Sequence, residues 1–306
     1  MRKAGFDTLT SKRAVAGALF AALSCGAVMQ ASAADGAKTA VPDFMAGGMG
    51  WNSAGGLVAV PGGPKPVGQD PKVKYVPNNV GEQPTWRYAD LNNPNLTQWA
   101  KDGLKKSNDM IDKGFAMYNR TSRCWQPGIP TLNLSPGRTY FLQTPKKVYI
   151  IWQRDQIVRQ VLLDVPHSKN PKPSWNGESV GHYEGDTLVV DTIGQTTKSF
   201  VDLYRTPHSE QLHVVERFRM IEGGKKLQVE MTVEDPAAFK EAWKGTKVWE
   251  KVTTQATKDG NVTGTFSEEI RCMDGEMVNP LNQAYASKLE PLPTDDGAEQ
   301  KLLAGG

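Results

Sequence analysis

The chain has 306 residues and a formal net charge of +3. Its first 34 residues hold four of the 36 basic residues and one of the 33 acidic ones, which leaves 32 of each in the remainder. A remainder without net charge lacks the one-sided positive surface that a phosphate backbone requires, so we do not expect nucleic acid as a partner.

Residues 1–34 have the pattern of a cleavable export signal. A basic start is followed by a run of small apolar residues at 14–27 and by the small-residue cleavage site Ala31-Ser32-Ala33. The apolar run is too short to span a bilayer stably and no later stretch approaches twenty apolar residues, so we expect a periplasmic protein without stable membrane insertion. A lipoprotein signal ending at Cys25 is the weaker alternative, because the residues before Cys25 fit that signal poorly.

The next segments differ in composition. Residues 35–94 are rich in Gly, Pro and Asn, which predicts an extended arm whose aromatic side chains could dock on the core. In residues 95–123, apolar side chains recur at helical spacing between lysines and aspartates, which predicts one amphipathic helix. Residues 124–136 contain three prolines and are expected to form a loop.

From Tyr140 onward the apolar residues alternate with polar ones, as in half-buried strands. Short turns such as Gly185-Asp186 and Glu222-Gly223-Gly224 separate these segments. The expected strands lie within residues 140–153, 157–164, 180–184, 187–193, 211–221, 225–234, 247–256 and 265–272. The clearest is Lys226–Glu234, in which every second residue is apolar.

Eight or nine antiparallel strands with one helix favour an all-β fold, an antiparallel up-and-down β-barrel of the lipocalin or calycin kind, over residues 124–275. A C-terminal tail, 276–306, follows. A barrel of about eight strands is wide enough for one small ligand, which predicts a pocket at its open end. A β-sandwich is the alternative, and it would move any pocket to a cluster of loops.

Two cysteines, Cys124 and Cys272, remain after removal of the signal. In an exported chain an even number favours a disulfide, which here would join the start of the barrel to its last strand. Two free thiols are the alternative. A cysteine nucleophile is less favoured, because an oxidising compartment works against a free reactive thiol.

Glu216 shares its strand face with four apolar residues, Leu212, Val214, Phe218 and Met220. A carboxylate in an apolar stripe must be paired, be protonated or line a polar cavity. One interpretation is a structural ion pair with an arginine such as Arg159, which itself lies between apolar neighbours. The other is a general acid or base with a raised pKa.

All four histidines, His167, His182, His208 and His213, fall in one stretch of 47 residues. Histidine titrates near neutral pH and is the commonest metal ligand, so this stretch is where we expect chemistry. A metal site formed by His167, His208, His213 and a carboxylate is conceivable, although no His-Glu-x-x-His motif is present. We expect the protein to bind neither a metal ion nor an organic cofactor. No Gly-x-Ser-x-Gly motif surrounds a serine, which argues against a common serine hydrolase.

Strand parity separates the candidates. His213 has parity opposite to Glu216, so the two side chains should point to opposite faces. Asp191 is either a second carboxylate inside the barrel or, if Leu188 and Val190 face inward, a solvated residue on the outer face. His208 lies in a loop that leads into the strand, and such loops often carry binding and catalytic groups.

Three segments carry a resemblance to a family. They are residues 175–192 (WNGESVGHYEGDTLVVDT), 207–218 (PHSEQLHVVERF) and 234–236 (EDP). Together they resemble a widespread, largely uncharacterised family of exported bacterial proteins, with the similarity running from about Cys124 to Cys272. The chain departs from that pattern at Val165-Pro166, where Gly-Arg is expected, and at His182, where an arginine or a similar residue is expected. The resemblance implies homology, and the departures imply a ligand specificity of this chain's own.

We therefore expect an exported enzyme that binds a small, aromatic or otherwise hydrophobic molecule and acts by general acid/base catalysis as a lyase, isomerase or hydrolase. The alternatives are a binding or carrier protein without chemistry, and a metal-dependent enzyme. The expected catalytic residues are His208, His213, Glu216 and Arg217. The expected ligand-binding residues are His167, Tyr183, Trp175, Asp191 and Arg159.

Overall fold

The computed structural model describes residues 41–74, 87–113, 125–135 and 137–253, and the short strands at 255–256 and 262–263. The chain divides into two units, Met1–Lys38 and Thr39–Gly306, and every described residue belongs to the second. The predicted signal peptide, both cysteines of the predicted disulfide, the predicted strand 265–272 and the C-terminal tail lie outside the described residues.

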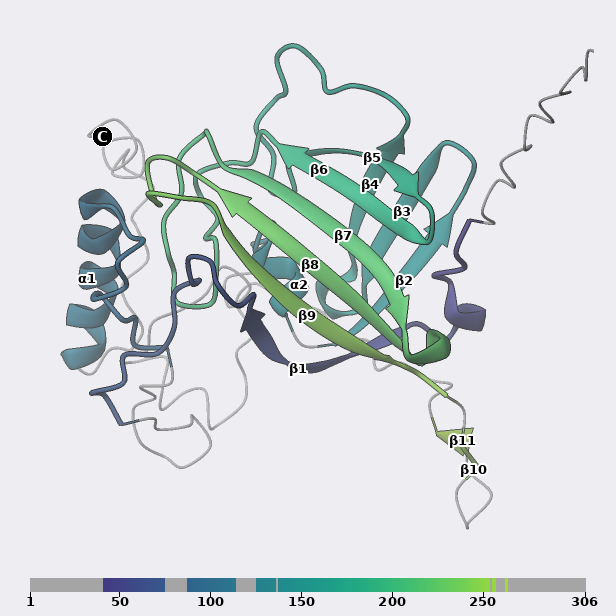
Figure 1. Cartoon of the computed structure of the whole chain (residues 1–306), viewed down its shortest axis with the longest axis horizontal. Coiled ribbons are helices and arrows are strands. Elements are labelled where there is room, and N and C mark those ends of the chain that lie inside the picture. Colours follow the sequence, from purple (N-terminus) through teal and green to yellow (C-terminus); the bar gives the residue numbers. More distant parts are fainter. Residues whose placement is uncertain are drawn as a thin grey trace, which may run out of the picture. The chain divides into compact units, whose positions relative to one another are not determined.

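Nine strands form a closed barrel, which confirms the predicted all-β barrel fold (Figure 1). Each strand pairs with the next along the chain, and the ninth pairs with the first. The strands are β1 Trp51–Ala59, β2 Arg138–Gln143, β3 Lys147–Trp152, β4 Ile157–Leu163, β5 Glu178–Glu184, β6 Thr187–Ile193, β7 His213–Ile221, β8 Lys226–Glu234 and β9 Trp243–Lys251. A separate pair, β10 Gln255–Ala256 and β11 Val262–Thr263, follows β9.

The barrel differs from an up-and-down design at one joint. β4 and β5 run parallel, with Val161 opposite Ser179, and residues 164–177 return the chain so that both strands start from the same end. Gly181 lies at this joint. A Cβ atom at Gly181 would lie 2.6 Å from the carbonyl oxygen of Val189 and 2.9 Å from a methyl group of Val161, so only glycine fits.

Alternating burial explains why these segments form strands. In β4 the residues alternate between buried and exposed along the whole strand, and in β8 every apolar residue of the alternating pattern is buried. Leu188, Val190, Glu216 and Phe218 are all buried and pair across β6 and β7, which places their side chains on the inner face. The outer face therefore carries Asp191.

β1 was not predicted, because it lies in the Gly- and Pro-rich segment expected to form an arm. Its first residue, Trp51, is fully buried, and its indole N–H donates to the carbonyl of Phe44 over 2.8 Å. The pairing of β1 with β9 shifts register between Ala54 and Val58, where Gly55 and Gly56 form a bulge. The glycines thus interrupt the alternation by which sequence analysis recognises strands.

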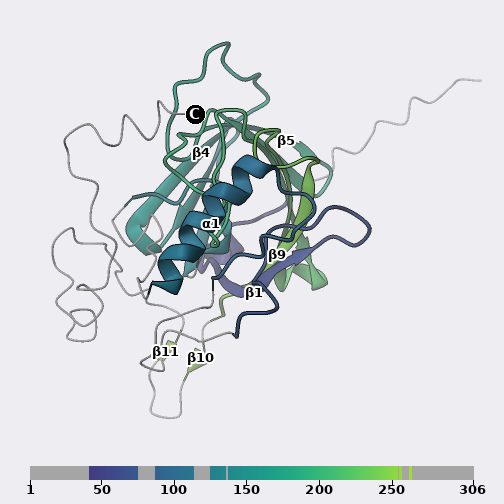
Figure 2. The same cartoon turned by 90° about the vertical axis from the view of Figure 1, so that its left-hand side faces the viewer.

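The main helix, α1, spans Gln98–Asp112 and is shorter than the predicted 95–123. It begins at Thr97, whose hydroxyl accepts the N–H of Ala100 and donates to the carbonyl of Ala237 over 2.6 Å. Its apolar residues Ala100, Leu104 and Ile111 are buried. Figure 2, which faces α1, shows it beside the loops at one end of the barrel.

The remaining helical segments are short. A single-turn helix, α2, spans Thr131–Leu134 in the segment predicted to be a loop. The 3₁₀ turns are Ala46–Gly48, Arg154–Gln156 and Glu222–Gly224. Over the described ranges, none of the helices has the length and apolar character needed to cross a membrane.

Candidate functional site

The interior of the barrel holds a buried ion pair. Glu216 from β7 and Arg159 from β4 are 0% and 2% exposed. Two guanidinium nitrogens of Arg159 donate to the two carboxylate oxygens of Glu216, over 3.0 and 2.5 Å. The remaining contacts of Arg159 are to the hydroxyls of Ser179, over 3.0 Å, and Thr192, over 2.6 Å. The first interpretation of Glu216, a structural ion pair, therefore describes what the structure shows.

The helix α2 closes the surroundings of this ion pair. The side-chain amide of Asn133 donates to Glu216 Oε1 and lies 3.6 Å from the sulfur of Met231. Asn133, Glu216 and Met231 are all fully buried. A fully buried carboxylate that already accepts three hydrogen bonds offers no open position to a substrate, so we assign Glu216 and Arg159 to the core.

On the outer face, four side chains form a continuous hydrogen-bonded series: Glu178, His167, Asp191 and His213. Glu234 lies next to the end of this series, beside His213, and we call the five residues together the histidine network. Asp191 Oδ1 lies 3.0 Å from Nε2 of His167 and 2.9 Å from Nε2 of His213. Glu178 Oε1 lies 3.0 Å from Nδ1 of His167. Glu234 Oε2 lies 3.7 Å from Nδ1 of His213, beyond hydrogen-bond distance.

Sheet register explains how this network forms. In the sheet, Asp191 of β6 lies opposite Val215, and His213 of β7 lies opposite Glu234 of β8. Asp191 and His213 have parity opposite to the buried Val190 and Glu216, so their side chains lie on the outer face. The returning segment 164–177 brings His167 to the same place. The predicted opposite orientation of His213 and Glu216 is confirmed, because Glu216 is inside and His213 outside.

The electrostatics of the network are set by these contacts. The hydrogen bond with Asp191 raises the pKa of His213, and burial opposes this in part. Conversely, the hydrogen bond with His213 lowers the pKa of the Asp191 carboxyl, and His167 adds to the effect. The pKa of Glu178 is lowered chiefly by the hydroxyl and backbone N–H of Ser168, which donate over 2.6 and 2.7 Å.

The network is accessible without being fully solvated. The side chains of His167, His213 and Asp191 are 21%, 36% and 39% exposed. Both ring nitrogens of His167 lie 3.0 Å from carboxylate oxygens. In His213 only Nε2 lies at such a distance, and Nδ1 is 3.7 Å from Glu234 Oε2, so Nδ1 is the nitrogen of the network most open to a reacting molecule. Since a carboxylate only accepts hydrogen bonds, Asp191 fixes the proton of neutral His213 on Nε2 and leaves Nδ1 as a base.

The other predicted catalytic residues lie elsewhere. His208 is buried, receives or donates a hydrogen bond at Ser199 Oγ over 2.8 Å, and donates from Nδ1 to the carbonyl of Ser209 over 2.9 Å. It therefore anchors its loop. Arg217 lies on the outer face and donates to Glu184 over 2.7 Å. His182 contacts the same carboxylate over 3.0 Å, so these three form an exposed group beside the network.

The predicted aromatic lining is not gathered at the histidine network. Tyr183 is half-buried, its hydroxyl accepts from the amide of Gln143 over 2.8 Å, and burial raises its pKa. Trp175 packs against Trp125 with ring centroids 5.5 Å apart. These contacts are those of packing residues.

The segments 207–218 and 234–236 are joined by hydrogen bonds in the structure. Asp235, in the segment 234–236, is buried and accepts from the backbone N–H of Ser209 over 2.6 Å and from its hydroxyl over 2.8 Å. Ser209 belongs to the segment 207–218. These residues hold the loop ahead of β7, and so the position of His213, in place.

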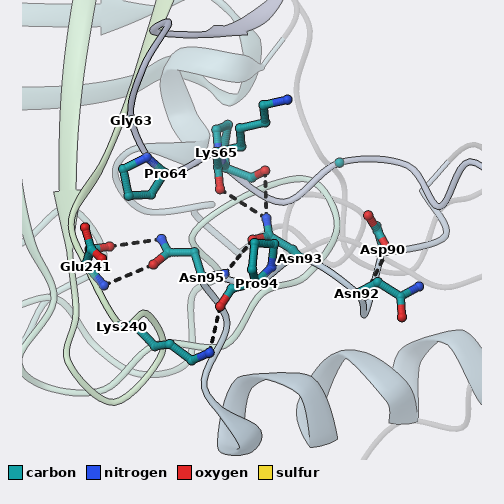
Figure 3. A pocket seen from close by; sticks show the side chains of 12 residues that line it. Gly63, Pro64, Lys65, Asp90, Asn92, Asn93, Pro94, Asn95, Lys240 and Glu241 are labelled. Carbon is teal, nitrogen blue, oxygen red and sulfur yellow. Dashed lines mark hydrogen bonds between the residues drawn. The ribbon is translucent and has the colours of Figure 1, made fainter.

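Two cavities lie apart from the network, and no histidine lines either of them. The larger, of about 590 Å³, lies between residues 63–68, residues 90–95 and the β8–β9 loop (Figure 3). Its polar groups bind one another: the amide of Asn95 pairs with the backbone of Glu241, and Lys240 donates to the carbonyl of Pro94 over 2.8 Å. The smaller, of about 390 Å³, is lined by Lys247.

Lys247 was missed by sequence analysis. It lies in β9 and shares the inward parity of Trp243 and Trp249, both of which are buried. The sequence held a signal for this position in the spacing of Trp243, Lys247 and Trp249. Residues an even number of positions apart in a strand point to the same face, so Lys247 should lie on the buried face with the two tryptophans.

Across the residues described by the structure, no group of three or more His, Cys, Asp or Glu side chains has an arrangement suited to holding a metal ion. Comparison of the chain with models of protein families and with curated proteins found no match.

Proposed function

We propose that this protein is an exported enzyme that acts on a small organic molecule by general acid/base catalysis, with His213 as the proton-transfer residue. The observation that carries the proposal is the hydrogen bond between Asp191 Oδ1 and His213 Nε2, together with the partial exposure of the His213 ring. A lyase, isomerase or hydrolase reaction suits such a residue, because each needs a proton removed from one atom and returned to another.

The chemistry follows from the orientation of the ring. Neutral His213 takes a proton from the substrate at Nδ1 and becomes an imidazolium, while its Nε2–H remains bound to Asp191. The hydrogen bond with Asp191 and the charge of Asp191 stabilise this imidazolium, and they are the main causes of the raised pKa of His213, to which Glu234 adds. The imidazolium then returns the proton from Nδ1 to the departing or rearranged group.

His167 is a positioning residue in this scheme. It contacts Asp191 from the other side and is itself held by Glu178, so the carboxylate of Asp191 cannot rotate away from His213 without breaking both contacts. Such orientation of a catalytic histidine by a carboxylate is a recurring requirement of acid/base sites.

Substrate depletion provides the test. The purified protein is incubated with a small-molecule extract of bacterial cells, and the compounds consumed and formed are followed by mass spectrometry. We expect compounds that are converted by the unchanged protein and by His182→Gln, an exposed histidine on the same face, but not by His213→Gln. Asp191→Asn should retain only a small fraction of the rate.

Two results would contradict the proposal: no compound converted by the unchanged protein, or equal conversion by His213→Gln. The first would favour a binding or carrier protein. Parallel incubations with a chelator and with added zinc, iron or copper test the third alternative, because conversion that requires an added metal would place a metal ion, and not His213 alone, at the centre of the reaction.

A further inference from the structure

The ammonium group of Lys247 is buried inside the barrel wall. The residue is 2% exposed, and its Nζ donates to the carbonyl oxygens of Ala54 and Gly55, over 2.7 and 2.5 Å. An ammonium group has three N–H donors, so two of them are satisfied by the protein backbone and one is left.

The bulge of β1 creates this arrangement. The register between β1 and β9 shifts between Ala54 and Val58, directly opposite Lys247. Gly55 has a φ of +63°, which turns its carbonyl out of the regular strand pairing and toward the lysine. A β-branched or bulky residue at Gly55 would resist that conformation.

No carboxylate among the described residues forms an ion pair with Lys247. Burial alone lowers the pKa of Lys247, with no neighbouring negative charge to offset it. Asp202 lines the same cavity, but its carboxylate is occupied by the N–H groups of Tyr204 and Thr206 and by the hydroxyl of Thr206. Burial also raises the pKa of Asp202, which weakens it further as a counter-ion.

The cavity beside this ammonium has an apolar wall. Its volume is about 390 Å³, within the range of small-molecule sites. The apolar side chains that line it are Leu57, Ala59, Pro66, Val67, Leu134, Leu203 and the ring of Tyr204. A second cation, Lys65, also lines it and is exposed.

We propose that this cavity is a binding site for a small monocarboxylate with an apolar body, whose carboxylate accepts a hydrogen bond from Lys247 Nζ. The carboxylate of the ligand would be the counter-ion of the Lys247 ammonium, and the apolar body of the ligand would cover the apolar wall of the cavity. None of the residues that line the cavity belongs to the histidine network, so the site is separate from the proposed acid/base centre and its test does not depend on turnover.

Titration calorimetry with matched probes tests this site. Phenylacetate and hexanoate carry the carboxylate, and phenylacetamide and hexanamide have the same bodies without the charge. We expect both carboxylates to bind the unchanged protein at least about ten-fold more tightly than their amides, because a charge-assisted hydrogen bond to a buried ammonium is lost with the amide. This comparison needs no variant.

Variants then locate the site. Lys247→Met should lower carboxylate affinity at least about ten-fold and leave amide binding unchanged, whereas Lys247→Arg should retain the preference for carboxylates. Lys244→Met removes an exposed lysine of the same strand and is the matched control, with no expected effect. Equal affinity for carboxylate and amide, no binding of either carboxylate, or an equal effect of Lys244→Met and Lys247→Met would overturn the proposal.

Discussion

The buried ion pair gives the sharpest prediction about stability. Glu216→Gln keeps the shape of the side chain but removes the charge that faces Arg159, whose side chain is only 1% exposed. The guanidinium would then be a buried cation without a counter-ion. Breaking a buried pair from one side costs about 3–5 kcal/mol, because the remaining charge is left without compensation.

The chain contains its own control for this experiment. Glu184→Gln breaks the ion pair with Arg217, in which the side chain of Arg217 is 40% exposed and that of Glu184 is 48% exposed. Exposed pairs of this kind contribute little, since water solvates both partners once they separate. Glu184→Gln should therefore leave the unfolding midpoint nearly unchanged.

Urea unfolding followed by circular dichroism measures both variants. The prediction is a free energy of unfolding lower by about 3–5 kcal/mol for Glu216→Gln, with a smaller loss for the double variant Arg159→Met/Glu216→Leu, because removing both charges leaves neither unpaired. If Glu216→Gln matches the unchanged protein, or if Glu184→Gln loses as much, the assignment of Glu216 to a structural ion pair is wrong.

Two further predictions concern the outer face and the parallel joint. Folding raises the pKa of His213, so protonated His213 should add to the free energy of unfolding. This contribution should be complete below the ordinary histidine pKa of about 6.5 and should be lost as the pH rises through the raised pKa. Urea unfolding measured from about pH 5 to about pH 9 should show this dependence in the unchanged protein and not in His213→Gln. Gly181→Ala should destabilise the protein by about 1–3 kcal/mol, because its Cβ would meet the carbonyl of Val189, whereas Gly56→Ala, which meets nothing within 4 Å, should be nearly neutral by the same measurement.

Local periodicity was sufficient to predict much of the barrel. The strand Lys226–Glu234 has the predicted bounds, because its alternation is unbroken. β1 was missed, since its glycines and bulge remove the alternation, and its pairing with distant β9 is what makes it a strand. Propensity therefore failed where a long-range contact decides the structure.

The candidate site was predictable in part. Parity alone placed His213 and Glu216 on opposite faces. It could not join His213 to Asp191 and His167, because that requires the register of β6 on β7 and the course of residues 164–177. The cavity beside Lys247 was also beyond local patterns, since it depends on the β1 bulge.

The coupling of His213 to Asp191 is the central claim, and a nuclear magnetic resonance titration of the histidine rings tests it most directly. The signal that disappears in His213→Gln identifies this residue. We predict that it titrates above the ordinary histidine pKa of about 6.5 in the unchanged protein and at lower pH in Asp191→Asn. A His213 signal that titrates at or below the ordinary value, and that Asp191→Asn leaves unmoved, would contradict the account.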